Sequence, residues 1–397
     1  MAVAGTFAVA LVAVALPLRI TTEDVPALAI QRTLASYVRL PGGAPVLTWP
    51  REGQAAVEVE GVGSLGASGG STPVPIASVA KVMTAYLTLL EHPLGAGQAG
   101  FVMTVTPAEV QEYKQRVALD QSTLPVRTGE RISERQALQA LLLPSANNVA
   151  TMLADHGRGG LPAFVARMNA TARTLGMRST TYTDPSGFDP TTVSTAADQL
   201  KLARVAMRVP AFAAIVDESS VDLPVAGAVE NYDSLLGEDG YVGVKTGSDR
   251  AAGGCFVFAK QITVGTLRLT VLGVVLGQRE GSLVPAALAS ARQLGDSAAA
   301  AVRLLTALPA GVGVFTVTSA DGRHATVVTK STLREVGWAG LKLPVKMTVA
   351  RAGPTELRAG QRLAIVTVDG VGASSTAAVA SRSLGRPSLG WRLAHLL

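Results

Sequence analysis

A serine and a lysine stand three residues apart at the start of an apolar stretch. Ser78 and Lys81 lie at the beginning of residues 78–92, which have the apolar spacing of a helix and end before Pro93. Positions three apart share one face of a helix, so the two side chains can reach each other. A serine hydroxyl becomes a nucleophile when a base takes its proton, and a lysine is such a base when desolvation or a second cation lowers its pKa. Alone, a serine and a lysine at this spacing are a weak signal. In chains with eight lysines, roughly one such pair is expected by chance in every two chains.

A second triplet, Ser145-Ala146-Asn147, lies where a helical stretch from Ser133 to His156 is interrupted. At such a break, a hydroxyl and an amide can project into a cleft and hydrogen-bond a substrate. The same residue types also cap helix N-termini without any further role. Taken alone, this triplet leaves a binding function and a capping function open.

The third triplet is Lys245-Thr246-Gly247, shortly before a predicted strand. A cation and a hydroxyl beside a glycine suit an anionic carboxylate lying against the backbone, because glycine has no side chain to block it. A second cation here would also help to keep Lys81 neutral. A chance Lys-Thr-Gly is expected in fewer than about one chain in ten. The three triplets, in this order and in helix, loop and strand contexts, therefore favour one active site.

Metal chemistry is disfavoured by the sequence. The four histidines (His92, His156, His324 and His395) lie far apart and form no H-E-x-x-H pattern. The single cysteine, Cys255, excludes an internal disulfide framework and thiolate metal sites, and its apolar surroundings predict a small core residue. We therefore expect no metal ion and no cofactor.

The composition favours folded domains. The 397 residues are 48% hydrophobic and 16% charged, and this length favours two domains. The net charge of +6 comes from 35 Lys+Arg against 29 Asp+Glu. These cations are scattered singly and without interleaved aromatic residues, which disfavours nucleic acid as a partner.

The N-terminus is uncharged as far as Arg19. As a helix, residues 1–18 would be about 27 Å long, at the lower limit for a membrane span. The sequence Ala-Val-Ala at 13–15 has the small-x-small form of a signal peptidase site. We expect residues 1–20 to be a signal peptide or an N-terminal membrane anchor, and the protein to be exported and associated with the membrane through this end.

Apolar patterning along the chain predicts an α+β region followed by an all-β region. Short strands separated by glycine turns are expected in residues 27–75, and a linker in residues 308–311. Residues 312–381 are strand-like throughout. The remaining expected elements are strands at 255–260 and 267–276 and helices at 78–92, 133–156, 162–175, 195–209 and 283–307.

The three triplets together resemble the S-x-x-K, S-x-N and K-T-G motifs of the serine-type D-alanyl-D-alanine carboxypeptidases, low-molecular-mass penicillin-binding proteins of peptidase family S11. The resemblance covers about residues 45–300 and includes the segments 75–84, 141–148 and 184–187. It implies a β-lactamase/transpeptidase-like fold, with helices on a central antiparallel sheet. It also implies a catalytic domain at 27–308 and a small β-rich C-terminal domain at 312–397.

A role for each motif residue follows from the resemblance. Ser78 is expected to attack the bond between the two terminal D-alanines of a peptidoglycan stem peptide, while Lys81 takes its proton and Ser145 passes a proton to the departing D-alanine. β-Lactam antibiotics are expected to acylate Ser78, and the enzyme is expected on the cell-wall side of the plasma membrane. The residues expected to bind the substrate are Asn147, Lys245, Thr246, Gly247 and Ser248.

Three other functions remain open. A class A-like β-lactamase shares the motifs but needs a deacylating glutamate between the second and third, and residues 157–200 contain no glutamate. A DD-endopeptidase or transpeptidase would use the same residues on the same fold. A catalytically silent cell-wall scaffold protein is disfavoured by the intact Ser78, Lys81 and Lys245.

Overall fold

The computed structural model describes residues 26–349 and 354–395 and divides the chain into two compact units. One unit comprises residues 46–302, and the other combines residues up to Pro45 with residues 303–397. The expected signal peptide or anchor at 1–20 lies outside the described residues. Within the described residues, no helix has both the length and the apolar character needed to cross a membrane.

The unit of residues 46–302 is built on a five-stranded antiparallel sheet in the order β11-β12-β13-β3-β4. Its two longest strands form a hairpin whose register starts at Val264 opposite Leu267, and Gly265 supplies the positive φ of +62° that the turn requires. The strands are β3 (Gln54–Val59), β4 (Gly63–Ser68), β11 (Tyr241–Asp249), β12 (Gly253–Val264) and β13 (Leu267–Gln278).

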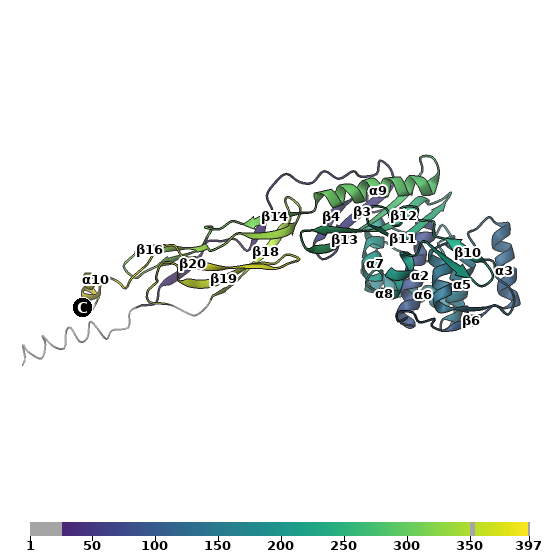
Figure 1. Ribbon diagram of the computed structural model, residues 1–397, viewed down its shortest axis with the longest axis horizontal. Helices are drawn as coiled ribbons and strands as arrows, with labels where there is room; N and C mark the ends of the chain where they lie inside the picture. Colours follow the sequence, from purple (N-terminus) through teal and green to yellow (C-terminus); the bar gives the residue numbers. More distant parts are fainter. Residues whose placement is uncertain (1–25, 350–353, 396–397) are drawn as a thin grey trace, which may run out of the picture. The chain divides into compact units, whose positions relative to one another are not determined.

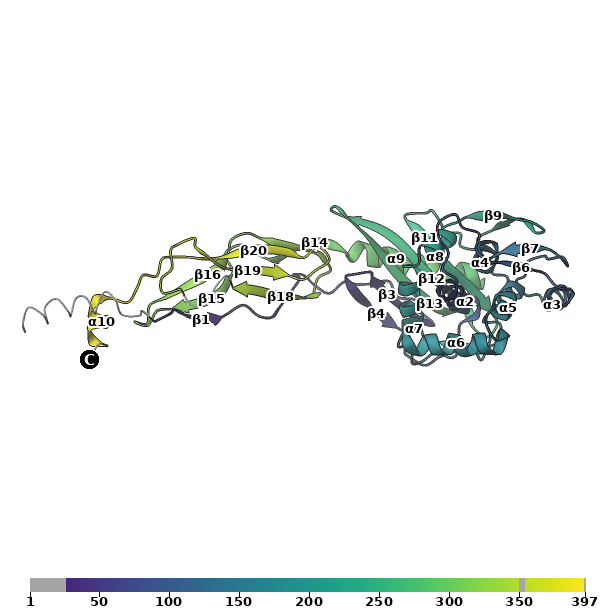
Figure 2. The ribbon, with the colours of Figure 1, turned by 90° about the horizontal axis from the view of Figure 1, so that it is seen from below.

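Helices cover both faces of this sheet (Figures 1 and 2). Helix α9 (Leu283–Ala301) packs on β12 and β13 from one side, and α7 packs on β13 and β3 from the other. Side chains alternate along β12, so Phe258 lies against Gly295 of α9 while Cys255 and Val257 join the helical core. The other helices are the 3-10 helix η1 (Ala77–Ala80), α2 (Lys81–Glu91), α3 (Pro107–Ala118), α4 (Glu134–Leu142), α5 (Asn147–His156), α6 (Gly160–Thr174), α7 (Ala196–Ala206) and α8 (Pro210–Val216).

Helix α2 is central to this unit, because it packs on α4, α5, α6, α7 and α8. Its side chains are buried along almost its whole length, as expected for a helix that is apolar on most faces. Short two-stranded sheets fasten the loops around it. They pair β5 (Val74–Pro75) with β8 (Val193–Ser194), β6 (Val102–Thr104) with β7 (Arg131–Ser133), and β9 (Ser220–Leu223) with β10 (Gly227–Glu230).

The second unit is an all-β module with its own core. Its main sheet has the strand order β1-β15-β16-β20-β19-β18-β2, and β14 pairs separately with β17. A short helix, α10 (Leu389–Ala394), follows the last strand. The strands are β1 (Ala29–Arg32), β2 (Tyr37–Arg39), β14 (Arg303–Leu308), β15 (Gly313–Thr318), β16 (His324–Thr329), β17 (Leu333–Gly337), β18 (Lys342–Val349), β19 (Arg362–Val368) and β20 (Ser374–Ala380).

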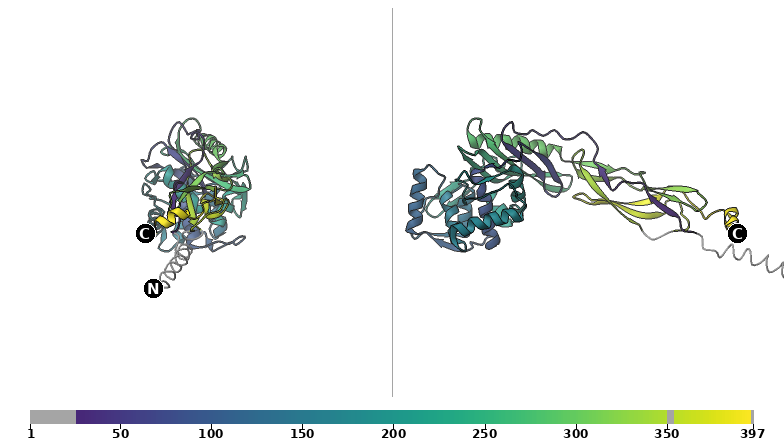
Figure 3. Two further views of the ribbon diagram at one scale, coloured as in Figure 1. Left: turned by 90° about the vertical axis from the view of Figure 1, so that its left-hand side faces the viewer. Right: turned by 180° about the vertical axis from the view of Figure 1, so that it is seen from behind.

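The expected domain limits of 27–308 and 312–397 differ from this division. Strand β1 pairs with β15, and β2 pairs with β18, so residues 29–39 belong to the β-rich module (Figure 3). The expected helix 283–307 ends at Ala301, because residues 303–308 form β14 and pair with β17. Alternation of apolar residues predicts a strand, but the partner of that strand is decided by the tertiary fold.

Candidate active site

Ser78 lies in η1, immediately before helix α2 begins at Lys81. The preceding residue, Ala77, has a φ of +46°, in the left-handed region that residues with a β-carbon rarely adopt. Such a conformation costs on the order of 1–3 kcal/mol and persists where the surrounding structure enforces it. The backbone is therefore strained at the residue that presents the Ser78 side chain.

The Nζ atom of Lys81 is completely buried and lies near three oxygens. It is 2.6 Å from Oγ of Ser78, 2.6 Å from Oδ1 of Asn147 and 3.1 Å from the backbone oxygen of Ser186. An ammonium donates one proton to each of these oxygens. A neutral amine donates its two protons to Asn147 and Ser186 and leaves its lone pair for the hydroxyl proton of Ser78. The surroundings thus satisfy both protonation states of Lys81.

The electrostatic surroundings favour the neutral state of Lys81. Burial lowers the pKa of Lys81 well below its ordinary value, and the positive charge of Lys245 lowers it further. The charge of Asp184 acts in the opposite direction, and that of Arg116 adds to the lowering. A lysine with a lowered pKa beside a serine hydroxyl is suited to act as a general base near neutral pH.

The loop of residues 184–187 packs against the first motif and contacts Lys81 through the backbone oxygen of Ser186. Its backbone is held by Asp184, whose Oδ2 accepts hydrogen bonds from the N–H and the hydroxyl of Ser186. Thr84 of α2 donates to the backbone oxygen of Pro185 at 2.6 Å. A β-carbon at Gly187 would lie 1.8 Å from the backbone oxygen of Ala77. The sequence marks the segment 184–187 by family resemblance alone and does not predict its contact with Ala77.

The second motif occupies the break between α4 and α5. Ser145 has a φ of +64°, and its hydroxyl is buried without a hydrogen-bond partner in the described structure. Asn147, the first residue of α5, contacts Lys81 through Oδ1 and donates from Nδ2 to Oε1 of Gln121 at 2.9 Å. Arg116 donates to the same Oε1 atom at 2.8 Å. Sequence reasoning missed Gln121 and Arg116, because nothing local marks them as neighbours of the motif.

The third motif lies inside β11, at an edge of the five-stranded sheet. Lys245 is 1% exposed, and its Nζ has no hydrogen-bond partner in the described structure. Burial lowers the pKa of Lys245 to about 7, against the opposing effect of Asp233. A β-carbon at Gly247 would lie 2.9 Å from the backbone nitrogens of Ser78 and Val79. Glycine is therefore needed where β11 approaches the nucleophile.

Some of the predicted site residues contact one another directly in the structure, and others do not. Ser78, Lys81 and Asn147 form one hydrogen-bonded group, and Gly247 lies against the backbone of Ser78. Thr246 is buried next to Gly247, and Ser248 is exposed at the end of the strand. Ser145 and Lys245 each contribute a buried polar atom that has no hydrogen-bond partner among the residues the structure describes, and such an atom is suited to bind a ligand.

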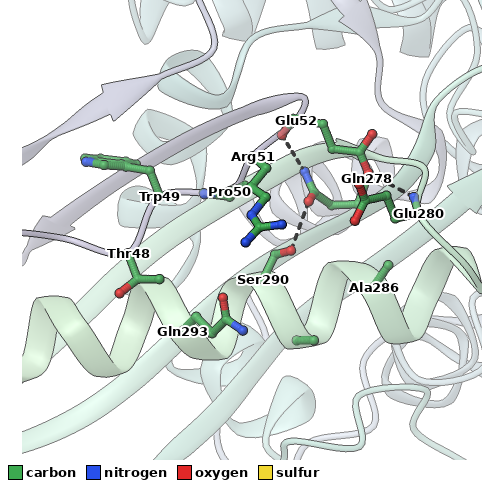
Figure 4. Close-up of a pocket in the computed structure, with 11 residues that line it drawn as sticks. Thr48, Trp49, Pro50, Arg51, Glu52, Gln278, Glu280, Ala286, Ser290 and Gln293 are labelled. Atoms are coloured by element: carbon green, nitrogen blue, oxygen red, sulfur yellow. Dashed lines mark hydrogen bonds between the residues drawn. The ribbon is translucent and has the colours of Figure 1, made fainter.

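A separate polar pocket of about 390 Å³ contains none of the predicted site residues (Figure 4). It lies between residues 48–52 and α9. Several of its polar groups are already bonded within the protein, since Ser290 donates to Gln278 and Glu52 accepts from the backbone nitrogens of Arg279 and Glu280. Its lining residues are Thr48, Trp49, Pro50, Arg51, Glu52, Gln278, Glu280, Ala286, Ala289, Ser290 and Gln293.

Comparison with known proteins assigns the chain to a family. The model of the peptidase S11 family, described as D-alanyl-D-alanine carboxypeptidase, matches residues 64–279, which are more than half of the chain. The protein belongs to this family. The matched region contains all three motifs.

Two curated relatives are similar to part of the chain. The D-alanyl-D-alanine carboxypeptidase DacB2 of Mycobacterium tuberculosis is 38% identical over 192 residues, which are 47% of this chain and 62% of that protein. A D-alanyl-D-alanine endopeptidase of Escherichia coli is 31% identical over 209 residues, 50% of this chain and 63% of that protein. The chain thus spans less than two thirds of the length of these relatives.

Solved structures share the fold. The DD-transpeptidase of Streptomyces K15 has a TM-score of 0.54 at 27% identity and covers 66% of this chain and 98% of its own. The D-alanyl-D-alanine carboxypeptidase DacD of Francisella tularensis has a TM-score of 0.60 at 19% identity and covers 86% of this chain and 96% of its own. The fold is therefore the α+β fold of the DD-peptidases, followed by a β-rich region.

Proposed function

We propose that this protein is a serine-type D-alanyl-D-alanine carboxypeptidase that removes the terminal D-alanine from peptidoglycan stem pentapeptides. The observation that carries the proposal is the group of Ser78, Lys81 and Asn147 beside the buried cation of Lys245. A neutral amine next to a serine hydroxyl can take its proton and so make the hydroxyl a nucleophile. A buried ammonium that has no hydrogen-bond partner in the described part of the chain supplies the counter-charge for a terminal carboxylate.

The proposed acylation step uses these groups in turn. Lys245 and Thr246 hold the terminal carboxylate of the substrate, and Asn147 holds its peptide backbone. Lys81 takes the hydroxyl proton of Ser78 as Oγ attacks the carbonyl carbon between the two D-alanines. The backbone N–H groups of Ser78 and Ser248 stabilise the charge that develops on the carbonyl oxygen, which agrees with the close approach of Gly247 to Ser78.

The C–N bond then breaks, and the leaving D-alanine receives a proton from Lys81 through the Ser145 hydroxyl. The carbonyl carbon is left as an ester on Ser78 Oγ. Water attacks this ester, which releases the shortened peptide and regenerates the hydroxyl. β-Lactams are proposed to acylate Ser78 in the same way, and the ester that they form is proposed to be hydrolysed slowly. Because peptidoglycan lies outside the cytoplasm, the enzyme is proposed to act there, with its N-terminal segment as the export signal or membrane anchor.

The test is intact-protein mass spectrometry after incubation with a penicillin, together with D-alanine release from a pentapeptide. The expected result is a single long-lived adduct and measurable release. Ser78→Ala is expected to abolish both, and Lys81→Ala is expected to bind substrate but to stall acylation. Rapid turnover of the penicillin would indicate a β-lactamase instead. A wild-type protein without adduct or release would indicate a silent scaffold protein.

A DD-endopeptidase is the second candidate, because relatives from Escherichia coli and Pseudomonas aeruginosa carry that name. The two activities share the acylation chemistry and differ in the leaving group. A cross-linked stem-peptide dimer, assayed beside the pentapeptide, separates them. If kcat/KM is higher for the dimer, the carboxypeptidase assignment is replaced by the endopeptidase one.

A further inference from the structure

Gln121 lies just beyond helix α3, where the end of that helix places it next to Arg116. The N–H of Gln121 donates to the backbone oxygen of Arg116 at 3.0 Å, and the N–H of Asp120 donates to that of Val117 at 3.0 Å. Asp120 has a positive φ of +53°. This pair of bonds around a residue in the left-handed region is a Schellman motif, which folds the chain back over the last turn of a helix. The side chain of Arg116 then donates to Oε1 of Gln121 at 2.8 Å.

The segment 121–124 is fastened to the start of α5, which carries the second motif. The N–H of Asn147 donates to the backbone oxygen of Ser122 at 2.8 Å. The side chain of Asn148 accepts the N–H of Leu124 at 2.9 Å and donates to the backbone oxygen of Leu124 at 3.0 Å. These bonds hold the backbone after α3 against the backbone of α5. The side chain at position 121 is therefore held beside the second motif.

A chain of three hydrogen bonds runs from Arg116 to Lys81, and its direction is set at Arg116. A guanidinium only donates, so the atom of Gln121 that faces Arg116 must be the oxygen Oε1. The same oxygen lies 2.9 Å from the side chain of Asn147, so the Asn147 atom that faces it must be the amide nitrogen. The other end of this amide, Oδ1, is thereby turned toward Lys81 and accepts from Nζ at 2.6 Å.

The direction of the last bond decides whether Lys81 can act as a base. A neutral amine has two protons and one lone pair. With the oxygens of Asn147 and Ser186 as acceptors, both protons are used, and the lone pair is left for the hydroxyl of Ser78 at 2.6 Å. If the amide of Asn147 were reversed, its nitrogen would donate to this lone pair. The amine could then not take the hydroxyl proton, although no residue had moved.

We propose that Arg116 and Gln121 are positioning residues for the general base. They hold the amide of Asn147 in the one orientation that leaves the lone pair of Lys81 to take a proton. The inference rests on the proposed function and extends it to two residues that lie in none of the three motifs. Both residues act on the reaction through Asn147.

Two substitutions of Gln121 separate its role as an acceptor from its packing. Glutamate has acceptors only, so Gln121→Glu still receives both bonds and still orients Asn147. Gln121→Met has a similar length but does not select one end of the amide. We expect the rate constant for acylation by a penicillin to fall about tenfold in Gln121→Met and to stay within about threefold in Gln121→Glu. Equal losses in the two variants would overturn the inference.

The rate constants are compared at the maximum of each pH profile. The charge of Arg116 lowers the pKa of Lys81, and a new carboxylate at position 121 would raise it, so the pH at which Lys81 becomes neutral differs between variants. At the maximum of its profile each variant has neutral Lys81. What remains is the effect of the orientation of Asn147.

Arg116→Met gives the sharper test when it is made in two backgrounds. Beside Gln121, loss of the guanidinium lets the glutamine reverse, and we expect the acylation rate constant to fall about tenfold. Arg116→Lys retains a donor and should restore part of this loss. In Gln121→Glu the orientation no longer depends on Arg116, so the same substitution should cost less than about twofold. An equal cost in both backgrounds would overturn the inference, because a packing defect would act in that way.

Arg167→Met is the matched control for Arg116→Met. Both arginines are partly buried and pair with a glutamate, Arg116 with Glu112 at 2.7 Å and Arg167 with Glu91 at 2.6 Å, at side-chain exposures of 20% and 29%. Arg116 also joins α3 to α5 by donating to Thr151 at 2.9 Å. Both variants are therefore expected to melt at a lower temperature, and only Arg116→Met should lose acylation rate. An equal loss of rate in Arg167→Met would overturn the inference.

NMR shows the orientation of the Asn147 amide without any turnover. In protein labelled with 15N-asparagine, the side-chain signal of Asn147 is identified by its absence in Asn147→Asp. Its amide protons are expected to show nuclear Overhauser effects to the γ protons of Gln121 in the wild type, and to the ε protons of Lys81 in Arg116→Met. An unchanged orientation in Arg116→Met overturns the inference. If the wild type neither releases D-alanine nor forms a penicillin adduct, the proposed function fails, and the spectra still decide whether Arg116 orients Asn147.

Discussion

The side-chain oxygen of Asn147 accepts a hydrogen bond from Nζ of Lys81 at 2.6 Å, across 66 residues of sequence. This contact joins the first motif to the second. It also orients the amide, because Oδ1 must face Lys81 while Nδ2 donates to Gln121. The contact therefore fixes the position of Lys81, the expected base, relative to Asn147, the amide expected to hold the substrate backbone.

Asn147→Asp is expected to slow acylation at neutral pH. A carboxylate beside Lys81 would raise the pKa of this lysine and keep it as an ammonium, which cannot accept the proton of Ser78. We expect the rate of penicillin acylation at pH 7 to fall about a hundredfold and to recover partly as the pH is raised. Stopped-flow acylation with a fluorescent penicillin measures this. Asn147→Ala should lose rate without recovering at high pH, and the same pH dependence in both variants would contradict the explanation.

Gly187→Ala is expected to destabilise the protein far more than Gly61→Ala. The two glycines have almost the same φ, +76° and +75°, so a methyl group strains the backbone equally. At Gly61 the methyl group meets nothing within 4 Å, whereas at Gly187 it would lie 1.8 Å from the backbone oxygen of Ala77. We expect a loss of about 1 kcal/mol at Gly61 and of more than about 3 kcal/mol at Gly187. Urea unfolding measures both values, and equal losses would mean that the packing of residues 184–187 on Ala77 contributes nothing.

Lys245→Met is expected to stabilise the folded protein while removing its activity. The pKa of Lys245 is about 7 when folded and about 10.5 when unfolded, so the unfolded chain binds more protons between these values. The wild type therefore gains stability as the pH rises from 7 toward 10.5, and below pH 7 it bears the full cost of the buried cation. We expect the variant to be about 1–3 kcal/mol more stable at pH 6, with a smaller difference at pH 9.5.

Calorimetry at the two pH values tests the Lys245→Met prediction. Lys114→Met in α3 is the control, because Lys114 is exposed and should change the melting temperature little at either pH. A variant at Lys245 that is less stable than the wild type at pH 6 would show that the ammonium is not a net cost to folding.

Glu134→Gln is expected to stabilise the protein above neutral pH. Glu134 is 2% exposed, and its Oε1 has no hydrogen-bond partner in the described structure. Burial raises its pKa to about 7, so the folded state binds more protons than the unfolded state between pH 4.5 and pH 7. Wild-type stability falls as the pH rises through this range. The neutral amide removes this loss, and we expect a gain of about 1 kcal/mol at pH 8 and almost none at pH 4.5.

Urea unfolding at pH 4.5 and pH 8 measures the effect of Glu134→Gln. Glu109→Gln serves as the comparison. The Glu109 carboxylate accepts the backbone N–H of Thr106 in a capping box at the start of α3, so it is satisfied and its replacement should not stabilise the protein. A gain for Glu134→Gln that does not depend on pH would exclude titration of Glu134 as its cause.

Much of the site was predictable because each of its motifs is made of residues that are close together in the sequence. The three-residue spacing of Ser78 and Lys81 required only the geometry of one helical turn. The break at Ser145 and the glycine at 247 were visible as interruptions of regular patterns. The residues that the sequence did not reveal are Gln121 and Arg116. Each is an ordinary polar residue, and it matters here because Gln121 accepts hydrogen bonds from both Asn147 and Arg116.

In the fold, too, features set by neighbouring residues were predictable and features set by distant partners were not. Helices α2, α6 and α7 and the hairpin of β12 and β13 follow from apolar periodicity, which is a property of neighbouring residues. The pairing of β1 with β15 and of β2 with β18 does not, because any exposed strand edge of matching length is a candidate partner. The sequence alone therefore determined which side chains could carry the chemistry and which segments form regular elements. Only the tertiary structure decided the charge on Lys81 and Lys245, because burial and the distance to other charges set the pKa of each lysine.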